Sequence, residues 1–490
     1  MSQNSSSSNN KDDRHAEKQI TPRAEDFSEW YLDVVSAAEL AENAPVRGCM
    51  IIKPNGYALW ERIQKILDDR FKELGVANAY FPLLIPERFL EKEAEHVEGF
   101  SPELAVVTHA GGKDLEERLA VRPTSETIMY DAFSRWVRSY RDLPLLINQW
   151  SNVMRWELRP RLFLRTSEFL WQEGHTVHTT EEEADERARQ MLQVYKDFAE
   201  DVMAVPVFIG QKSESEKFAG ALHTYTVESV TQEGKALQFA TSHNLGQNFS
   251  RAFEITYLGQ DGARHYGWQT SWGISTRAIG GMVMTHSDDK GLVLPPRMAP
   301  QQVVITTVGH GMTNFDRVPS EALRLAEQLR GSGLRVHLDD RELRPGEKFF
   351  EWERKGVPLR LELGGKELSA QVLTAVRRDT GEKQEINLSQ ADTQVSELLD
   401  KIQTDMFRRA AEYKENWTKE VDSWEEFVKE IQAGHLVLAH WNGKADVEEK
   451  IKDETGASTR CAPFDHPAEK GKCIYSGEPS SCRFLFAKAY

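Results

Sequence analysis

Apolar residues recur along the chain with two different periods, and each period predicts its own kind of element. Spacings of three and four residues predict amphipathic helices in 21–40 and 57–74. A charged helix is predicted in 180–202, where three glutamates near the N-terminus suit the helix dipole. Short apolar runs bounded by Gly or Pro predict strands in 48–54 and 79–86. The first part of the chain therefore mixes long helices with strands.

The pattern changes after the Pro-containing linker at 292–297. Here we predict strands in 303–306, 334–338, 358–363 and 371–376, a helix in 320–330, and a charged helical stretch in 393–414. Strands that alternate with helices predict a compact α/β domain on a mixed sheet. The charged helical stretch then leads to a last domain.

Length and composition set limits on the kind of protein. A chain of 490 residues is too long for one core and suggests about three domains. We expect a disordered tail at 1–20, where little can be buried, and domains at 21–297, 298–402 and 403–490. No apolar run approaches the roughly 20 residues that cross a bilayer, so we expect a cytoplasmic protein without a membrane partner. A net charge of −16 argues against a general polyanion-coating protein, and four cysteines are too few for a disulfide framework.

A basic stretch from Val153 to His175 predicts a hairpin that carries guanidinium groups. The strands are expected in 153–157 and 169–173, with Arg155 and Glu157 on one face and Arg165 at the start of the return strand. Two converging guanidinium groups form a planar, permanently charged clamp for phosphate. A surface hairpin with solvated arginines fits these residues as well.

Three further stretches gather polar residues that suit an active site. Thr124 and Glu126 precede a predicted helix, where they fit either an ordinary N-cap or a carboxylate that holds an amino group. Thr241 and His243 share one face of a predicted strand, although a lone His is often a structural residue. Arg277 follows a Gly-containing strand and begins a predicted helix.

The spelling of these stretches resembles one family closely. Thr-Ser-Glu at 124–126, Arg-Trp-Glu at 155–157, Glu-Phe-Leu-Trp-Gln-Glu-Gly-His at 168–175, Thr-Ser-His at 241–243 and Gly-Ile-Ser-Thr-Arg at 273–277 are similar to motifs of class II aminoacyl-tRNA synthetases. Among these enzymes the chain resembles the prolyl-tRNA synthetase family. The resemblance covers essentially everything after residue 20.

Two larger features extend the resemblance. The long helix and Pro-containing strand in 57–86 resemble motif one, the dimer-forming element of class II enzymes, although a helix followed by a strand also fits any α/β protein. The interval between Arg165 and Arg277 is short, whereas many bacterial members carry a large editing domain there. The chain thus resembles the archaeal and eukaryotic branch, which lacks that domain.

The resemblance implies a fold and a reaction. The fold is α+β: a class II catalytic domain with an antiparallel sheet flanked by helices, an α/β anticodon-binding domain, and a small α/β C-terminal domain. The reaction is the ATP- and Mg²⁺-dependent attachment of L-proline to tRNA(Pro) through prolyl-adenylate, by a homodimer. A non-catalytic synthetase paralogue that binds tRNA or regulates another protein is the alternative. In the anticodon-binding domain, Phe349 and Trp352 fit either base stacking or the core.

The resemblance also implies roles for single residues. The implied catalytic residues are Arg155, Glu157, Arg165 and Arg277. The implied nucleotide-binding residues are Arg155, Glu157, Arg165, Gln238, Thr241, Ser275 and Arg277. The implied substrate-binding residues are Thr124, Glu126, Arg155, Trp171, Glu173, His175, Phe218 and His243.

The C-terminal domain departs from the family pattern. Members of this branch commonly hold zinc there through two cysteine pairs, but 439–447 contains no cysteine, and Tyr475 stands where the partner of Cys473 would fall. A structural zinc needs four ligands, so we predict that no structural zinc is bound. In these enzymes the terminal tyrosine, here Tyr490, folds back toward the active site.

Overall fold

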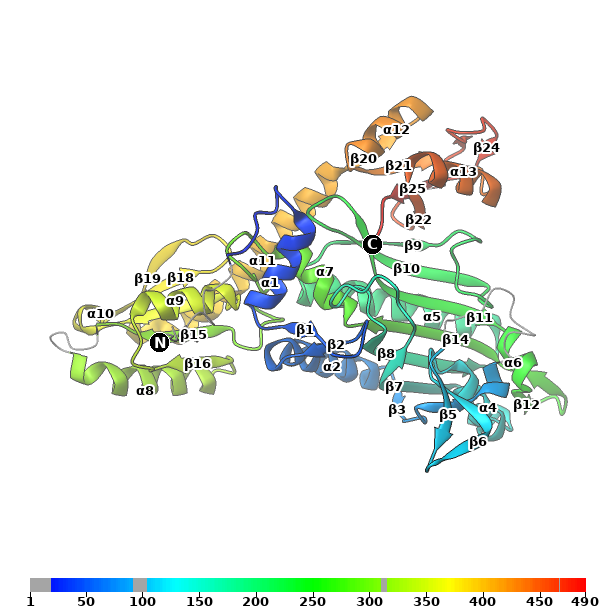
Figure 1. The fold of residues 1–490 in the computed structure, drawn as a ribbon, viewed down its shortest axis with the longest axis horizontal. Coiled ribbons are helices and arrows are strands. Elements are labelled where there is room, and N and C mark those ends of the chain that lie inside the picture. The colour runs from blue at the N-terminus through cyan, green and yellow to red at the C-terminus, as the bar shows by residue number, and fades with distance from the viewer. Residues whose placement is uncertain (1–18, 91–103, 310–314, 467) are drawn as a thin grey trace, which may run out of the picture.

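The structure is a computed structural model that describes residues 19–90, 104–309, 315–466 and 468–490. The tail expected at 1–20 lies outside these residues except for its last two. Three parts follow one another along the chain: a large sheet with its helices, a smaller sheet with helices at one end of the molecule, and a C-terminal part (Figure 1).

The first part begins with two helices, as the hydrophobic periodicity predicts. These are α1 (Phe27–Ala37) and α2 (Pro54–Glu73). The Asp26 side chain caps α1 by accepting from the backbone N–H groups of Ser28 and Glu29. Each helix buries one apolar stripe in the main core of the molecule.

The rest of the first part consists of strands and of the helices that flank them. The elements are β1 (Ala41–Asn43), β2 (Met50–Ile52), β3 (Ala77–Asn78), β4 (Leu84–Pro86), β5 (Val106–Ala110), β6 (Lys113–Val121), α4 (Glu126–Trp136), η1 (Tyr140–Asp142), β7 (Leu145–Met154), β8 (Glu168–His178), α5 (Glu181–Asp197), η2 (Phe198–Val202), β9 (Val207–Gln211), β10 (His223–Val230), β11 (Ala236–Gly246), α6 (Asn248–Phe253), β12 (Thr256–Leu258), β13 (Arg264–Tyr266), β14 (Trp268–Ser275) and α7 (Arg277–His286).

The large sheet is the framework of the first part. Its strands run in the order β9-β10-β11-β14-β8-β7-β3; neighbouring strands are antiparallel except for β3, which is parallel to β7. Helix α5 packs along β8, β10, β11 and β14. Trp272 of β14 points to the helices, because its ring centroid lies 5.0 Å from that of Phe71 on α2. Side chains alternate along a strand, so the neighbours of Trp272 point to the opposite face.

Several predicted strands differ from the observed ones in their limits, and two of them differ most. Of the strand predicted in 79–86, only Leu84–Pro86 forms a strand, which is β4, whereas β3 ends at Asn78, before the predicted range. Between them, Pro82 has no backbone N–H to donate to a ladder. The strand predicted in 153–157 ends at Met154, and the return strand begins at Glu168. The basic residues between these strands therefore lie in a connection.

The second part is built on a mixed sheet, as the alternation of elements predicts. Among the described residues this sheet has five strands in the order β16-β15-β17-β18-β19, and β15 is parallel to both of its neighbours. The elements are β15 (Val303–Thr307), η3 (Phe315–Arg317), α8 (Val318–Gly331), β16 (Val336–Asp339), α9 (Pro345–Arg354), β17 (Leu359–Leu363), α10 (Gly365–Ala370), β18 (Val372–Arg377), β19 (Lys383–Asn387) and η4 (Leu388–Gln390).

The two aromatic residues of α9 differ in their surroundings. Trp352 is 8% exposed, and its Nε1–H donates to Asp339 Oδ2 at 2.8 Å. Phe349 is half-buried, and the guanidinium carbon of Arg360 lies 4.0 Å from its ring centroid. Trp352 is therefore a residue of the interior and cannot stack on an unpaired base.

The long helix α11 (Ala391–Trp417) leads from the second part to the third (Figure 1). It lies against the first part on the way: Tyr413 donates to the Gln232 carbonyl at 2.9 Å, and Lys414 Nζ donates to the Val207 carbonyl at 2.8 Å. The domain boundary expected at 402/403 falls inside this helix.

The C-terminal part extends the large sheet. Its elements are β20 (Thr418–Val421), α12 (Trp424–Gln432), β21 (Leu436–His440), α13 (Ala445–Thr455), β22 (Ser458–Pro463), β23 (Gly471–Lys472), β24 (Pro479–Ser480) and β25 (Arg483–Ala487). Strand β22 pairs with β9, and the order β20-β21-β25-β22 continues into β9, so the described residues form one sheet of eleven strands. Nothing in the periodicity of the chain predicts this junction.

Candidate active site

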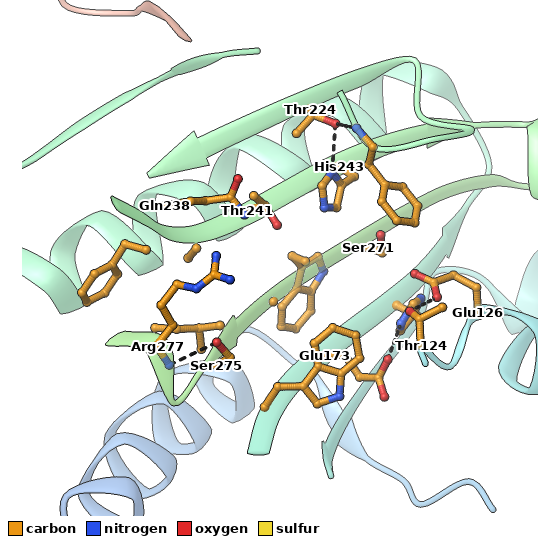
Figure 2. A pocket seen from close by; sticks show the side chains of 18 of the residues that line it. Thr124, Glu126, Glu173, Thr224, Gln238, Thr241, His243, Ser271, Ser275 and Arg277 are labelled. Carbon is orange, nitrogen blue, oxygen red and sulfur yellow. Dashed lines mark hydrogen bonds and ion pairs between the residues drawn. The ribbon is translucent and has the colours of Figure 1, made fainter. Parts of the chain in front are cut away.

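A cavity of about 270 Å³ opens on the face of the large sheet that α5 does not cover (Figure 2). Ser242 of β11 marks the covered face, because its hydroxyl donates to the Ala188 carbonyl of α5 at 2.7 Å. The residues on either side of Ser242 point into the cavity. The predicted site residues that line it are Thr124, Glu126, Arg155, Trp171, Glu173, His175, Phe218, Gln238, Thr241, His243, Ser275 and Arg277.

A β-bulge in β11 places Gln238 on the same face as Thr241 and His243. Thr226 of β10 opposes Thr241, whereas Glu228 opposes Gln238, so β11 carries one extra residue in this interval. In a regular strand, residues three apart point to opposite faces. The bulge thus explains how all three side chains reach the cavity.

The segment before α4 faces the cavity and does not form an ordinary N-cap. Ser125 is the N-cap residue of α4, but its side chain makes no capping bond. Its hydroxyl donates instead to Glu173 Oε1 at 2.5 Å, and the Thr124 hydroxyl donates to the Glu126 carboxylate. The Ser125 hydroxyl is therefore directed away from the helix end, toward residues that line the cavity.

Glu173 is the centre of a buried hydrogen-bond network. Besides Ser125, its Oε1 accepts from Gln149 Nε2 at 2.8 Å and from the Ser151 hydroxyl at 3.3 Å, and Oε2 lies 3.3 Å from His175 Nε2. Burial by itself raises the pKa of this carboxyl group, but the bonds and charge of its partners outweigh burial and hold the pKa below its usual value. Glu173 is therefore an anion at pH 7.

His243 supplies a neutral counterpart to that carboxylate. Burial, with smaller contributions from the charges of Lys212 and His175, lowers its pKa to about 3. Its Nδ1 lies 3.0 Å from the hydroxyl of Thr224, and its ring centroid lies 4.9 Å from that of Phe218. The imidazole thus forms a wall of the cavity without adding charge.

Arg155 is held over two aromatic rings. Its Nε–H donates to the Pro123 carbonyl at 2.8 Å, and its guanidinium carbon lies 5.7 and 5.4 Å from the ring centroids of Phe169 and Trp171. Burial lowers its pKa, although the carboxylates in the site oppose that effect. The remaining donors of the guanidinium group are left for a ligand.

Arg277 points into the cavity from the first residue of α7. Its Nε–H donates to the Leu164 carbonyl at 3.0 Å, and its backbone N–H donates to the Ser275 hydroxyl at 3.2 Å. Burial and the charges of Arg155 and Arg165 lower its pKa to about 10, which leaves it protonated at pH 7. Three guanidinium groups therefore share one region, as an anion site requires.

Glu157 and Arg165 line an adjoining cavity of about 170 Å³, which shares Arg155 and Arg277 with the first. The prediction that Arg155 and Glu157 share a strand face and that Arg165 opens the return strand is wrong. All three follow or precede the strand ends, because the connection forms a turn closed by a backbone hydrogen bond from Arg165 to Arg161 at 2.9 Å. The turn still brings Arg165 Nε within 3.8 Å of Glu157 Oε2.

Several residues of the site were missed by the sequence analysis. Lys212, Glu216 and Thr224 line the cavity, and Phe169 lies beneath Arg155. The sequence around these residues indicates no function. Lys212 and Glu216 have the pattern of solvated charges near Phe218, and Thr224 has that of an ordinary threonine in a strand. Only the pairing of β9, β10 and β11 places them beside His243.

The C-terminal residues lie close to the start of β11 and to the turn between β7 and β8. Ala236 at the start of β11 donates to the Lys488 carbonyl at 2.9 Å and accepts from the N–H of Tyr490 at 3.2 Å. The guanidinium carbon of Arg161 and the Nζ of Lys235 lie 5.5 and 4.8 Å from the Tyr490 ring centroid. Tyr490 thus folds back onto the turn between β7 and β8, as expected.

Cys473 and Tyr475, at the expected position of a zinc-binding pair, make contacts with other residues of the C-terminal part. Cys473 is buried, and the N–H of Ser476 lies 3.5 Å from its Sγ. Tyr475 donates to Glu454 at 2.7 Å and stacks edge-on against Trp424. In the part of the chain that the structure describes, no three His, Cys, Asp or Glu side chains form a group that could hold a metal ion. The absence of structural zinc stays a prediction.

Comparison with known proteins assigns each part of the chain to a domain family. Residues 107–286 match the tRNA synthetase class II core domain (G, H, P, S and T), residues 302–398 match an anticodon binding domain, and residues 424–490 match the prolyl-tRNA synthetase C-terminal domain. An antiparallel sheet with an arginine-rich cavity lies within the first match. The fold and the site therefore define a class II aminoacyl-tRNA synthetase, with the α+β architecture that the sequence implied.

Curated relatives narrow the class to one family. The chain is 54% identical over 480 residues to the proline--tRNA ligase of Chlorobium phaeobacteroides (strain BS1), which covers 96% of this chain and 99% of the relative. It is 52% identical over 484 residues to that of Chloroherpeton thalassium and 52% identical over 488 residues to that of Parabacteroides distasonis, with 97% and 96% of this chain and 100% and 99% of the relatives covered. The chain belongs to the prolyl-tRNA synthetase family.

No helix in the described parts of the chain is both long and apolar enough to span a bilayer.

Proposed function

We propose that the protein catalyses the ATP-dependent attachment of L-proline to tRNA(Pro) in two steps through prolyl-adenylate. The observation that carries the proposal is the juxtaposition of two subsites in two adjoining cavities: a small polar and aromatic pocket in the first, and a cluster of three guanidinium groups where the two cavities meet. The full-length relatives named proline--tRNA ligase support the same assignment.

The amino-acid subsite suits a small cyclic imino acid. We assign Thr124 and Glu126 to the charged nitrogen of proline, since a carboxylate with an adjacent hydroxyl offers acceptors for its two N–H groups. We assign Trp171, Glu173, His175, Phe218 and His243 to the walls around the ring. A neutral His243 does not repel the ammonium group, whereas the anionic Glu173 attracts it.

The nucleotide subsite suits a triphosphate. We assign Arg155 to the α-phosphate and to the proline carboxylate, and Arg165 and Arg277 to the more distant phosphates. We assign Glu157, Gln238, Thr241 and Ser275 to the remaining nucleotide contacts. The stacking of Arg155 on Phe169 and Trp171 fixes its fork in advance, which lowers the entropy lost when phosphate binds.

The chemistry needs no strong base in its first step. The proline carboxylate is already an anion at pH 7, and one of its oxygens attacks the α-phosphorus of ATP while the bond to pyrophosphate breaks. Arg155 and Arg277 remain charged and neutralise the charge that develops on the phosphate oxygens. In the second step a terminal ribose hydroxyl of tRNA attacks the prolyl carbonyl, and AMP leaves.

Mg²⁺ would supply charge neutralisation between phosphate oxygens. The described residues contain no group of three His, Cys, Asp or Glu side chains able to hold a metal. This fits an ion that keeps several waters and binds through substrate phosphates with one or two carboxylates. Glu157, whose Oε2 lies 3.8 Å from Arg165 Nε in the adjoining cavity, is a carboxylate that would serve this purpose.

The remaining parts of the chain are assigned to the second substrate and to assembly. We propose domains at 21–297, 298–402 and 403–490, of which the second binds the anticodon region of tRNA(Pro). We also propose a cytoplasmic homodimer with no membrane partner and no structural zinc. The exposed Tyr80, Leu83, Leu84 and Val106 in and around β4 and β5 support the dimer, because they form apolar surface near the expected motif-one element.

A non-catalytic paralogue is the alternative, and amino-acid-dependent ATP–pyrophosphate exchange separates the two. The purified chain should incorporate labelled pyrophosphate into ATP when L-proline is added, and much less with each other amino acid. A binding protein supports no exchange. Exchange that depends on a different amino acid would overturn the assignment of the pocket.

A further inference from the structure

A turn at 212–218 forms one wall of the cavity and faces two ways. Lys212 and Phe218 line the cavity, whereas the hydroxyl groups of Ser213 and Ser215 point to the C-terminal part. A backbone hydrogen bond from Lys217 to Ser213 at 3.0 Å closes the turn. The residues that line the cavity and the residues that contact the C-terminal part therefore belong to one short, hydrogen-bonded turn.

Glu448 on α13 accepts from this turn. Its Oε1 accepts from the Ser213 hydroxyl at 3.1 Å and from the hydroxyl of Thr459 on β22, and its Oε2 accepts from the Ser215 hydroxyl. The residue is 6% exposed, whereas its neighbour Glu449 is exposed. A buried carboxylate is tolerated only where such bonds satisfy it, so the three hydroxyl groups and Glu448 hold one another in place.

The other end of the turn is tied to the amino-acid subsite. The backbone N–H of Phe218 donates to the Thr224 hydroxyl at 2.9 Å, and that hydroxyl lies 3.0 Å from His243 Nδ1. Figure 2 shows Thr224 and His243 side by side at the rim of the cavity. A shift of the turn therefore displaces the Phe218 ring and breaks its bond to the Thr224 hydroxyl, which is the group that contacts His243.

We propose that Glu448 is a positioning residue for the amino-acid subsite, through which the C-terminal part holds turn 212–218 and sets the affinity for the amino acid. The inference rests on the proposed function, because it concerns the proline subsite. Glu448 itself is not among the residues that line the cavity, so it acts through the turn. The phosphate-binding arginines come from α7 and from the connection between β7 and β8, and none of them contacts turn 212–218 or Glu448 through the bonds described.

The test compares Glu448→Met with the matched control Glu449→Met in proline-dependent ATP–pyrophosphate exchange. Glu448→Met keeps the length of the side chain but removes the shared acceptor of three hydroxyl groups. These groups are left with their contacts to one another, in which Ser213 Oγ lies 3.2 Å from Thr459 Oγ1 and 3.3 Å from Ser215 Oγ. We expect the KM for proline to rise on the order of tenfold. The KM for ATP should change less than about twofold, since the arginine cluster is untouched. Glu449→Met should match the wild type.

Glu448→Gln serves as the conservative rescue. Its amide oxygen still accepts from the hydroxyl groups, so its KM for proline should lie near that of the wild type. If Glu448→Met folds too poorly for kinetics, Ser215→Ala removes one donor from the exposed side of the turn and should raise the same KM by a smaller factor. The inference would be overturned by an unchanged KM for proline in Glu448→Met and Ser215→Ala. It would also be overturned if the KM for proline and the KM for ATP rose by the same factor.

Hydrogen exchange separates a failure of this inference from a failure of the proposed function. Amides of 212–218 should exchange faster in Glu448→Met than in Glu449→Met, whether or not the protein activates proline. Absence of proline-dependent exchange in the wild type would overturn the proposed function. Equal amide protection in the two variants would overturn the role of Glu448 even in an active enzyme.

Discussion

Arg155 is predicted to be more than a positive charge. Arg155→Lys retains a cation but loses the planar fork, the bond to Pro123 and the stacking on Phe169 and Trp171. We expect the kcat of proline-dependent exchange to fall roughly 10²–10³-fold, as on removal of one donor at developing charge. Far-ultraviolet circular dichroism and the melting temperature should be unchanged. A folded Arg155→Lys enzyme with near-normal kcat would refute the phosphate assignment.

Other residues that line the cavity differ in how far they could be predicted. Thr124, Glu126 and Arg277 could be named because their spelling and order are specific to one family. Gln238 reaches the cavity by way of a β-bulge, which leaves no mark in the alternation of residues. Lys212 follows β9, whose pairing with β10 brings it to the cavity, and pairing partners far apart in sequence cannot be read from one chain.

His178 should make stability depend on pH. It is 3% exposed, and burial, with the charge of Arg187, lowers its pKa to about 4. The unfolded chain has a higher pKa, so it binds a proton first as the pH falls, and stability is lost between about pH 6.5 and pH 4. The loss is about 3 kcal/mol for this one group.

The variant His178→Gln keeps a partner for the Thr176 hydroxyl, which lies 2.8 Å from His178 Nε2, and removes the titration. The difference in unfolding free energy between wild type and variant should therefore shrink when the pH is lowered from 7.5 to 4.5. Denaturant titrations at both pH values measure it. A constant difference would show that His178 does not titrate in this range.

The type of each helix or strand was predicted more accurately than its first and last residues. The helices and strands of the second part follow their periodicity closely, because local propensity and tertiary packing agree there. The first strand of the hairpin around Arg155 was predicted to run too far, because β7 ends at Met154, where the connection to β8 begins. The predicted return strand at 169–173 lies within β8. The junction of β22 with β9 could not be predicted, since nothing local specifies which sheet edge a strand joins.

Across that junction a buried ion pair joins β22 to β10. Arg460 Nη2 lies 2.8 Å from Glu228 Oε2, with side chains 9% and 0% exposed. Burial opposes the charge of Arg460, but Glu228 outweighs burial and raises the pKa of the guanidinium group. Removing one partner leaves the other charge buried without its counter-ion, which is far more destabilising than replacing both.

Arg460→Met should therefore destabilise the protein by roughly 3 kcal/mol, and Arg460→Met combined with Glu228→Gln should recover most of that loss. Thermal unfolding of the wild type, both single variants and the double variant measures the interaction energy. The account fails if the double variant is no more stable than Arg460→Met alone.

At the scale of the whole molecule, three parts share one continuous framework. Helix α11 links the second part to the third, and the third part adds its strands to the sheet that carries the site. The order of the parts could be predicted from the change of periodicity along the chain. Their arrangement could not, because it depends on side-chain contacts between α11 and the first part, such as the bond from Lys414 to Val207.

The protein is predicted to be a homodimer. Leu83 and Leu84 are exposed apolar residues at the start of β4, and burying them in a partner gives the association its driving force. Static light scattering should give twice the mass of the chain, and Leu83→Arg should shift the mass toward the monomer. Leu323→Arg, at an exposed leucine of α8, is the matched control and should leave the dimer intact. A wild-type enzyme that is active and monomeric would contradict this prediction.

The central claim is that this cavity activates proline for transfer to its own tRNA, and charging of tRNA(Pro) tests it most directly. Purified protein is mixed with a tRNA(Pro) transcript, ATP, Mg²⁺ and labelled L-proline, and acid-stable label on the tRNA is counted. The account predicts prolyl-tRNA(Pro) that forms only when ATP and proline are both present, and little charging of a transcript for another amino acid. No charging by a folded protein, or charging with a different amino acid in preference to proline, would contradict it.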